Sequence, residues 1–495
     1  MKILNHKYSN KLELNKFIQE NQIPNDNSIL VQVFHSNCSI EYIEIVRMEL
    51  KESLSNIAII GTSTAGIVSN GNINDNEIII SFSLFEKSSV KAVSYCNIDN
   101  DNLFKNLASY ITSKTKLIVA FVNTFNHDAT KLLHYIEDKY PNIIIAGGNA
   151  GDDYKFSSCY IFSSTCKNCD VAFAFIDSDV LKVHSNYILN WQTIGKDMVV
   201  TKSVGSTVYE IDDRKALEVY DYYLGEEISG NMLAHGVEFP LIYKQKDTNV
   251  ARAAVAIDEE NGSITFAGSI KEGTKVRFGY ANIESLVDMN QKQIKEAYTT
   301  KNEALYVYTC AARRQMLGNY IKDELSMLNQ LGDTTGFVTY GEFFHNYTSC
   351  NNDLLNITTT FITLNENESV EPIIYQEKLV QKDKKDIILK AMTKLISRTS
   401  DENIKNTEEL QIKKEELKTY FDSIVDGLAI LNLETHCFTN ANKAFEDLIG
   451  YTKEQLLTIQ MEDIHPKESM DYVKKEFEKQ LTNASYIAKD MPLLN

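Results

Sequence analysis

"SILVQVFHSNCSIEYIEIVRMELKESLSNIAIIG", residues 28–61, carries the pattern that decides the fold. An apolar run, SILVQVF, precedes a stretch at 39–54 in which apolar residues recur every three or four positions, and a second apolar run ends at Gly61. This order predicts a strand, an amphipathic helix and another strand. Such units are typical of proteins that pack helices on a sheet, so the expected fold class is mixed α/β.

The same rhythm continues along the chain to about residue 213. Further strands are predicted at 77–85, 89–96, 116–123, 143–148, 160–164 and 170–177, and helices at 101–113 and 127–140. We expect the neighbouring strands 77–85 and 89–96 to pair as a hairpin. The next region is richer in strands, with a helix at 215–225 and strands at 251–258, 263–268, 275–280, 305–310, 336–344 and 354–364. The pattern predicts two domains, 27–213 and 214–375.

Length and charge limit the classes of function. A chain of 495 residues is expected to form about three globular units. Its formal net charge of -18 disfavours nucleic acid and anionic membranes as partners, because both would repel it. No apolar run approaches the roughly 18 residues that a membrane span needs, and the first residues lack the apolar core of a signal peptide. We therefore expect a cytoplasmic protein.

The eight cysteines are scattered without regular spacing, which favours reduced thiols over a disulfide framework. One pair, Cys166 and Cys169, forms a CKNC sequence. No second CxxC or HxxxH follows at the spacing of a zinc site, and the pair does not open a thioredoxin-like helix. We predict ordinary loop and strand thiols there, with no metal site and no cofactor.

A long helix is predicted at 376–418, where lysine and glutamate dominate. Apolar residues recur there every seven positions, at Leu389, Ile396, Leu410, Leu417 and Ile424. Asn403 fills the missing step, and a polar residue at one such position often sets the register of a parallel dimer. The segment is interpreted as a signalling-helix linker that supports a homodimer. The alternative is an unpaired, solvated amphipathic helix.

Several separated motifs carry a family resemblance. They are GTSTAGIVSNG (61–71), AGGNAGDDYKF (146–156), CAARRQMLG (310–318), TGFVTYGEFF (335–344) and LNITTTF (355–361). In this order they resemble the amino-terminal and carboxy-terminal halves of the FIST sensory module, over residues 27–370. The resemblance implies an input module of a bacterial signalling protein, such as a two-component system, that binds a small ligand, with amino acids among the candidates.

Polar side chains within these motifs are the candidate ligand-binding residues. They are Ser63, Thr64, Asp152, Arg313, Arg314, Glu342 and Asn356. An arginine can clamp a carboxylate with two hydrogen bonds, and Glu342 could receive an ammonium group, so the set predicts a zwitterion site. Asn356 and Thr358 alternate along a predicted strand and should share one face. The competing interpretation is structural: turns for Ser63, Thr64 and Asp152, and ion pairs for the charged residues.

Cys310 raises a second possibility, because it ends a strand just before a helix-like run with two arginines. Helix N–H groups and cations lower a thiol pKa, which would favour a nucleophile. Catalysis also needs an oriented base, and neither His345 nor His235 has a spacing that commits it to Cys310. A non-enzymatic sensor is therefore expected. A Cys310-dependent enzyme and a protein-interaction scaffold are the alternatives.

Residues 419–495 carry a second resemblance. From Leu417 to Pro466 the order of strand, turn, strand, short helix and HP is similar to the first half of a PAS domain. Asn442 is predicted to cap the short helix and Gly450 to end it in the left-handed conformation, while His465 is interpreted as loop structure. A PAS sheet needs three further strands, and no output domain is recognisable. We expect a fragment of a longer signalling protein, or a partner that supplies the output.

Overall fold

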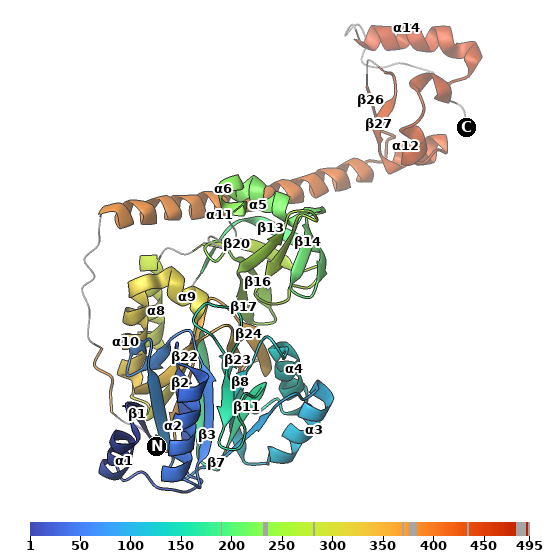
Figure 1. The fold of residues 1–495 in the computed structure, drawn as a ribbon. Coiled ribbons are helices and arrows are strands. Elements are labelled where there is room, and N and C mark those ends of the chain that lie inside the picture. Colours follow the sequence, from blue (N-terminus) through green and yellow to red (C-terminus); the bar gives the residue numbers. More distant parts are fainter. Residues whose placement is uncertain are drawn as a thin grey trace. The chain divides into compact units, whose positions relative to one another are not determined.

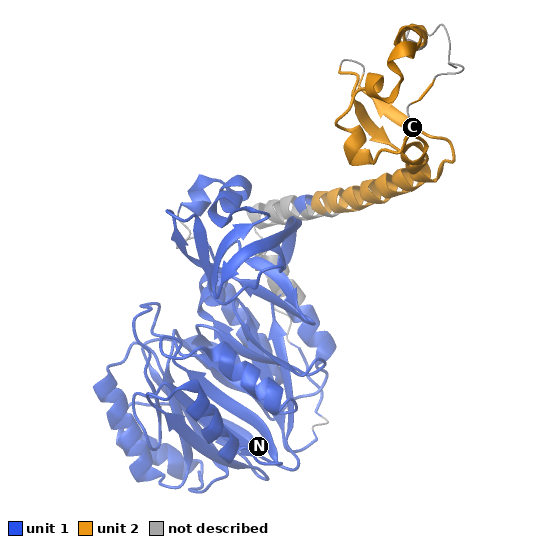
Figure 2. Ribbon diagram, turned by 90° about the vertical axis from the view of Figure 1, so that its right-hand side faces the viewer, with its two compact units in different colours: residues 1–397 blue, residues 398–495 orange. Residues whose placement is uncertain are grey.

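The computed structural model describes residues 1–189, 191–230, 236–280, 283–368, 371–375, 384–432, 435–481 and 492–493. Within this described part the chain forms two compact units, residues 1–397 and 398–495 (Figure 2). His235 and residues 376–383 of the predicted linker lie outside the described residues. The mixed α/β fold class predicted from the sequence is confirmed.

The first sheet of the larger unit contains the strand–helix–strand element of residues 28–61. Its strand order is β1 (Lys2–Lys7), β6 (Ile78–Leu84), β2 (Ile29–His35), β3 (Ala58–Ser63) and β10 (Ile161–Ser163). Strands β2 and β3 are parallel and are joined by α2 (Ile40–Ser53), while the other neighbours are antiparallel. Helices α1 (Lys11–Glu20) and α2 pack on one face.

Two more sheets repeat this arrangement. The second runs β7 (Ser89–Tyr95), β11 (Val171–Asp177), β8 (Thr115–Val122), β9 (Ile144–Asn149), β23 (Glu342–Asn346) and β24 (Asn351–Leu355). The third runs β12 (Lys182–Ile188), β25 (Thr359–Asn365), β21 (Ala304–Cys310), β22 (Asp333–Thr339), β4 (Ile67–Ser69) and β5 (Asn72–Asn74). In both sheets, as in the first, the first three strands of the order are antiparallel neighbours, and the third and fourth strands are parallel.

The three sheets exchange strands in a cycle. The hairpin β4–β5 follows β3 of the first sheet in the chain but pairs with β22 of the third. Strand β10 follows β9 of the second sheet but pairs with β3 of the first. Hairpin β23–β24 follows β22 of the third sheet but pairs with β9 of the second. The amino-terminal half of the larger unit, up to residue 213, and its carboxy-terminal half, from residue 214, are therefore interlocked.

The inner faces of the three sheets share one hydrophobic core. One aromatic residue occupies the equivalent position in the first strand of each parallel pair: Phe34 on β2, Phe121 on β8 and Tyr308 on β21. In each case the preceding residue of the strand lies opposite a glycine of the parallel neighbour, which is Gly61, Gly147 or Gly336. Their rings meet around Phe337, whose centroid lies 5.5 Å from those of Phe34 and Tyr308. The equivalent aromatic positions explain why the three sheets close on one another.

The outer faces of the second and third sheets are covered by helices. Helices α3 (Asn100–Tyr110) and α4 (Ala129–Lys139) pack on β8 and β11, beside which they lie in Figure 1. Helix α10 (Ile321–Leu331) and the short α9 (Ala311–Leu317) pack against β21, and α8 spans Ile283–Ala297. The buried stripe of α10 includes Leu325, Leu328 and Leu331. Burial of such stripes holds each helix on its sheet.

A fourth sheet is inserted between β12 and α8. Its order is β17 (Thr248–Arg252), β16 (Leu241–Gln245), β20 (Lys275–Tyr280), β13 (Gln192–Val204), β14 (Thr207–Ile211), β19 (Ser263–Phe266) and β18 (Ala254–Asp258), with β15 (Arg214–Lys215) beside β14. Helix α5 (Ala216–Leu224) is where the sequence predicts a helix, and α6 (Glu226–Ser229) follows it. Val219 and Tyr220 of α5 pack into the core of this sheet.

Four strand predictions are wrong. The predicted strand 251–258 is broken at Ala253, and its two parts, β17 and β18, lie at opposite edges of the fourth sheet. Strands β6 and β7 do not form a hairpin, because β6 pairs with β1 and β2 while β7 pairs with β11. The predicted strand 336–344 is broken at Tyr340 and Gly341, and its two parts join different sheets. The predicted strand 354–364 is broken at residues 356–358, where Ile357 has a φ of +59°. The alternation argument for Asn356 and Thr358 therefore does not hold.

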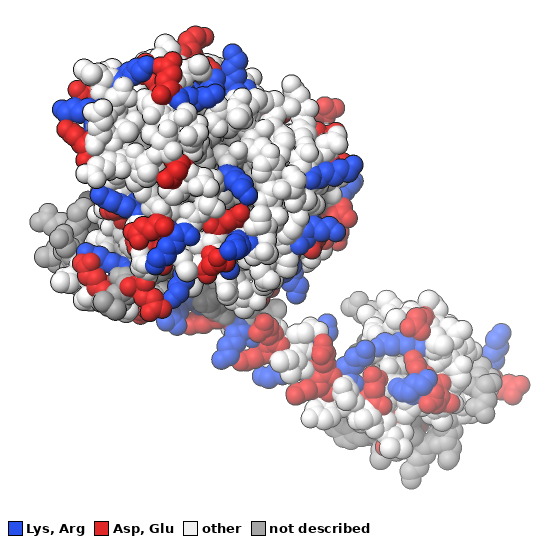
Figure 3. Space-filling view, turned by 90° about the horizontal axis from the view of Figure 1, so that it is seen from below, with Lys and Arg blue, Asp and Glu red and all other residues white. Residues whose placement is uncertain are grey.

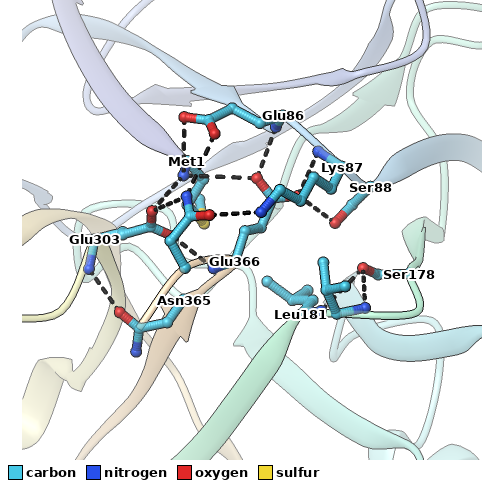
Figure 4. Close-up of polar contacts among 11 residues, drawn as sticks. Met1, Glu86, Lys87, Ser88, Ser178, Leu181, Glu303, Asn365 and Glu366 are labelled. Atoms are coloured by element: carbon cyan, nitrogen blue, oxygen red, sulfur yellow. Dashed lines mark hydrogen bonds and ion pairs between the residues drawn. The ribbon is translucent and has the colours of Figure 1, made fainter. Parts of the chain in front are cut away.

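The amino group of Met1 lies among three glutamates (Figure 4). Its nitrogen is 2.9 Å from Glu303, 3.5 Å from Glu366 and 3.7 Å from Glu86. The Glu366 carboxylate also accepts the backbone N–H groups of Glu86 (2.6 Å) and Lys87 (3.0 Å). These contacts connect β1 and the loop after β6 with residues beside β21 and β25.

The long helix α11 spans Lys384–Ser423, in agreement with the helix predicted for the linker. Beyond it lie β26 (Ala429–Leu431), β27 (Phe438–Ala441), α12 (Lys443–Ile449), α13 (Lys453–Leu456) and α14 (Met470–Leu481). Asn442 caps α12 by accepting the N–H of Phe445, and Gly450 ends it at a φ of +76°, so both predictions are confirmed. His465 is buried, with Nδ1 2.6 Å from the carbonyl oxygen of Pro492.

Lysine and arginine side chains are interspersed with aspartate and glutamate on the face of the molecule in Figure 3. Among the described helices, none combines the length and the apolar character that crossing a bilayer requires.

Candidate functional site

Three of the motifs, 61–71, 146–156 and 335–344, begin on the second strand of a parallel pair. Gly61 lies on β3, Gly147 on β9 and Gly336 on β22, opposite Val33, Ala120 and Val307 of the parallel neighbours. A Cβ at Gly147 would lie 2.0 Å from the oxygen of Ala120, and one at Gly336 would lie 1.7 Å from the oxygen of Val307. These two glycines are therefore required for close packing of the strands.

Asp152 organises the loop that follows the second motif. Its carboxylate accepts the N–H groups of Phe156 (2.9 Å), Ser157 (2.7 Å) and Ser158 (3.0 Å), and the hydroxyl of Tyr340 (2.6 Å). Burial raises the pKa of Asp152, but the hydrogen bonds from Tyr340 and these N–H groups outweigh it, so the pKa lies below its usual value. Asp152 therefore acts as an ionised anchor of the loop.

We call residues 152–158 the aromatic loop. Asp153, Tyr154 and Phe156 all have positive φ values, between +49° and +63°, which cost energy in residues other than glycine. The loop reaches from the amino-terminal half of the unit onto the carboxy-terminal half. The Tyr154 hydroxyl donates to the oxygen of Ala311 at 3.1 Å, and the Phe156 ring stacks on Tyr340 at 4.6 Å.

A cavity of about 440 Å³, which we call the alanine cavity, lies beneath the aromatic loop. Its lining is mostly small and apolar: Ala253, Ala254, Val255, Ala267, Ala311, Ala312, Val237 and Ile357, with Tyr154 and Phe156. Four further lining residues carry polar groups: Cys310, Gln315, Tyr340 and Asn356. A mainly apolar cavity with a few polar groups is typical of small-molecule sites.

A second hollow, of about 730 Å³, adjoins the alanine cavity, and we call it the charged hollow. Tyr154, Phe156 and Gln315 line both. The charged hollow also contains Arg314 and Asp75, joined by two hydrogen bonds of 2.8 and 2.6 Å. The Arg314 side chain is 23% exposed and that of Asp75 is 41% exposed, so this pair remains accessible to solvent.

A third, polar cavity of about 640 Å³ shares Ala267, Tyr340 and Asn356 with the alanine cavity. Behind this shared wall, the buried Arg252 donates to Asn356 Oδ1 at 2.8 Å and to the oxygen of Leu354 at 2.9 Å. Its Nε has no hydrogen-bond partner among the described residues. Sequence reasoning missed Arg252, although an arginine within the largely apolar segment ARAAVAID is a signal, since a buried charge needs partners.

The structure separates the two adjacent arginines. Arg313 is fully buried, and its guanidinium binds Glu324 at 2.6 Å and 3.2 Å. Its Nη1 donates to the oxygens of Leu189 (3.3 Å) and Ile357 (3.2 Å). The donors of Arg313 are thus directed at protein groups, and Arg313 does not line the alanine cavity or the charged hollow. Only Arg314 of the pair lines a described cavity.

Glu342 is also fully buried and does not line these cavities. Its carboxyl accepts hydrogen bonds from the hydroxyls of Thr358 (2.5 Å) and Thr339 (2.9 Å). Burial raises the pKa of Glu342 to about 8, despite the hydrogen bonds from these threonines. A carboxyl that keeps its proton near neutral pH is poorly suited to hold an ammonium group. The structure therefore does not place Arg313 and Glu342 at opposite ends of one cavity.

Cys310 lines the alanine cavity but has the environment of a core thiol. Burial, together with the neighbouring Glu342 carboxyl, raises its pKa to about 12. Nucleophilic attack requires the thiolate, which this environment disfavours. His345 is occupied elsewhere, with Nδ1 2.8 Å from Asn352 Oδ1.

Ser63 and Thr64 contribute to local structure. Ser63 Oγ accepts the N–H of Tyr160 at 2.9 Å. Thr64 Oγ1 donates to the oxygen of His35 at 3.2 Å and accepts the N–H of Gly66 at 3.2 Å. These bonds satisfy the turn after β3, as the structural interpretation of the first motif expected. Of the seven candidate residues, Arg314 and Asn356 line the cavities described above.

Comparison with known proteins gives two family matches. Residues 29–214 match the FIST N domain, and residues 216–345 match the FIST C domain. The second match ends within β23, whereas the third sheet is completed by β25 at residues 359–365. No curated protein matches the chain.

Proposed function

Because the chain carries the FIST N and FIST C domains, which are sensory domains of signal-transduction proteins, we propose that its FIST module binds an amino acid with an apolar side chain. The side chain occupies the alanine cavity. The carboxylate and ammonium groups of the ligand lie in the charged hollow, at Arg314 and Asp75. Asp75 thereby takes the role that the sequence had suggested for Glu342.

The observation that carries this proposal is the adjacency of the two spaces. One is apolar and the other holds both signs of charge, and they share Tyr154, Phe156 and Gln315. A zwitterion can replace the Arg314–Asp75 pair with two equivalent pairs, so no charge is left without a partner. The aromatic loop, anchored by Asp152 but strained at three residues, is the element that ligand entry would displace.

A thermal-shift screen of the full chain against the common amino acids tests this function. A ligand present at a hundred times its dissociation constant should add about 2.7 kcal/mol to the free energy of unfolding. Arg314→Met should weaken binding about tenfold or more, because it removes a charge-assisted hydrogen bond. Arg277→Met is the matched control, since Arg277 pairs with Asp197 away from these cavities.

Three outcomes would reject the proposed site. Binding that survives both Arg314→Met and Ala312→Leu, which fills the alanine cavity, would place the ligand elsewhere. Turnover of an amino acid that is lost in Cys310→Ala would instead support an enzyme. Stabilisation by a protein partner but by no amino acid would support the scaffold alternative.

We further propose that ligand binding in the cytoplasm is relayed through α11 to a PAS-like second unit, and from there to a separate output domain or protein. The exposed residues Ile396, Leu410 and Leu417 follow the seven-residue repeat along α11, and Ile424, the next in the repeat, comes directly after its end. Leu410 is 68% exposed and Leu417 is 67% exposed, which leaves an apolar stripe for a second copy of the helix. A parallel homodimer would cover it.

Sedimentation analysis tests the dimer. Replacing both Leu410 and Leu417 with lysine should shift the chain from dimer to monomer, because like charges would face each other along the seam. Replacing Glu408 and Glu415 with lysine, outside the stripe, is the control. A wild-type chain that sediments as a monomer at all accessible concentrations would refute this part of the proposal.

A further inference from the structure

Three cysteines from two distant segments meet beside the second sheet. Cys166 and Cys169 lie in the turn between β10 and β11, and Cys96 directly follows β7. Because Tyr95 is opposite Val171 in the antiparallel pair β7–β11, Cys96 is brought next to that turn. The Sγ atoms of the three residues lie within 4.8 Å of one another, and those of Cys96 and Cys166 are 2.8 Å apart.

The turn itself has a fixed shape. Cys169 N–H donates to the oxygen of Ile161 at 2.7 Å, and Ser163 N–H donates to the oxygen of Cys166 at 2.8 Å. Asn168 has a φ of +51°, which directs the chain back so that both thiols of CKNC lie on one side. A tight C-x-x-C turn with a third thiol from a neighbouring strand is a common arrangement of metal ligands.

We propose that Cys96, Cys166 and Cys169 form a binding site for a thiophilic d¹⁰ cation, Zn²⁺ or Cu⁺. Three sulfur donors favour these soft ions over magnesium or calcium. Zinc–sulfur bonds of about 2.3 Å place the ligand sulfurs roughly 4 Å from one another. The Cys96 and Cys166 sulfurs, which are 2.8 Å apart, would have to move apart by about 1 Å to reach this spacing. Both are partly exposed, whereas Cys169 is buried.

Burial and the neighbouring Cys166 thiol together raise the pKa of Cys96 to about 11. Burial also raises the pKa of Cys169. The nearby Asp170 carboxylate adds negative charge but accepts the N–H of Asn97 and the amide of Asn126, so it is engaged in structure. Because raised pKa values oppose the thiolate form, a cation has to displace the thiol protons as it binds.

A disulfide between Cys96 and Cys166 is the competing use of the same residues. It would need an oxidant and would leave Cys169 without a role, whereas a metal ion uses all three thiols. The site lies beside the ends of strands β7, β10 and β11, and none of its three cysteines lines the alanine cavity or the charged hollow. Its occupancy is therefore independent of the proposed ligand site.

Metal titration of the reduced full chain provides the test. Zn²⁺ is titrated against a chromophoric zinc chelator, and Cu⁺ against a copper(I) chelator. Co²⁺ reports the number of bound thiolates through its sulfur-to-metal charge-transfer absorption. We expect one equivalent of Zn²⁺ or Cu⁺, and the relative affinities identify which ion the site prefers.

Cys96→Ser and Cys166→Ser should each weaken binding by more than the roughly 10- to 100-fold that outer-shell changes cause. These two positions are partly exposed, so the variants should keep the circular dichroism of the wild type, and Cys350→Ser is the control that should bind normally. The proposal is overturned if the reduced chain binds neither ion, or if binding persists unchanged in both variants. It is also overturned if the metal-free chain isolated from cells carries a Cys96–Cys166 disulfide.

Discussion

The buried pair of Arg313 and Glu324 offers the sharpest test of how the structure divides the two adjacent arginines. The Glu324 carboxylate accepts hydrogen bonds from Arg313, from the hydroxyl of Thr359 at 2.6 Å and from the amide of Asn290 at 2.7 Å. Arg313 and Glu324 have side chains that are 0% exposed. Removing one partner leaves a buried charge without its counterion, which costs about 3–5 kcal/mol.

We therefore expect Arg313→Met and Glu324→Leu each to lower the free energy of unfolding by about 3–5 kcal/mol. In the double variant, the loss of unfolding free energy should be smaller than the sum of the two single losses by about 1–3 kcal/mol, because neither buried charge remains. Arg314→Met should cost only about 0–1 kcal/mol, since its pair with Asp75 is partly exposed. The same Arg314→Met change should weaken ligand binding.

Urea unfolding followed by tryptophan fluorescence measures these differences. Trp191 is the only tryptophan of the chain and is buried. Its indole N–H lies 3.4 Å from the oxygen of Ile357, the same oxygen that accepts a hydrogen bond from Arg313. The signal therefore comes from the region of the pair. Equal losses of unfolding free energy in Arg313→Met and Arg314→Met would refute the view that only Arg313 belongs to a buried ion pair. So would a double variant of Arg313 and Glu324 whose loss equals the sum of the two single losses.

Three further predictions concern pH, connectivity and packing. Because the folded pKa of Glu342 is about 8 and the unfolded value is near 4.5, the native state keeps a proton that the unfolded chain releases. The free energy of unfolding should then fall by on the order of 5 kcal/mol as pH rises from about 5 to 8. Glu342→Gln should remove this pH dependence in urea titrations. A pH dependence that is unchanged in Glu342→Gln would contradict the raised pKa of Glu342. A fragment of residues 1–213 should be digested rapidly by protease, since β4 and β9 lose their partners β22 and β23, whereas a protease-resistant fragment would show that the halves fold separately. Gly336→Ala should lower the melting temperature far more than Gly205→Ala, because a Cβ at Gly336 meets the oxygen of Val307 and one at Gly205 meets nothing within 4 Å; equal shifts would contradict the packing argument.

Local signals predicted much of the fold. Helices α2, α4 and α5 have apolar residues at helical spacing, and α12 has a capping asparagine and a terminal glycine, so each was recognisable from neighbouring residues. Strand pairing was not recognisable in the same way. The segments at 78–84 and 89–95 adjoin in sequence, yet they join different sheets, because each pairs along its whole length with a buried strand elsewhere in the chain.

The candidate site shows the same division. The motif residues were visible in the sequence, but Arg313 and Arg314 have the same chemistry and differ only in what surrounds them. One turns into the core towards Glu324, and the other faces the hollow that contains Asp75. Arg252 and Asp75 became candidates only when the fold brought Asp75 into the charged hollow and Arg252 against Asn356 behind the cavity wall. Likewise, Cys96 gives no local sign that it belongs with CKNC.

The sequence by itself determined the secondary-structure types, the mixed α/β class and the FIST motifs, because periodicity, capping and glycine placement act between residues close along the chain. Tertiary structure alone decided the strand exchange among three sheets, the depth of each charged residue and the meeting of three thiols. Those outcomes depend on contacts between segments tens to hundreds of residues apart, where burial and the cost of leaving a charge unpaired select the neighbours.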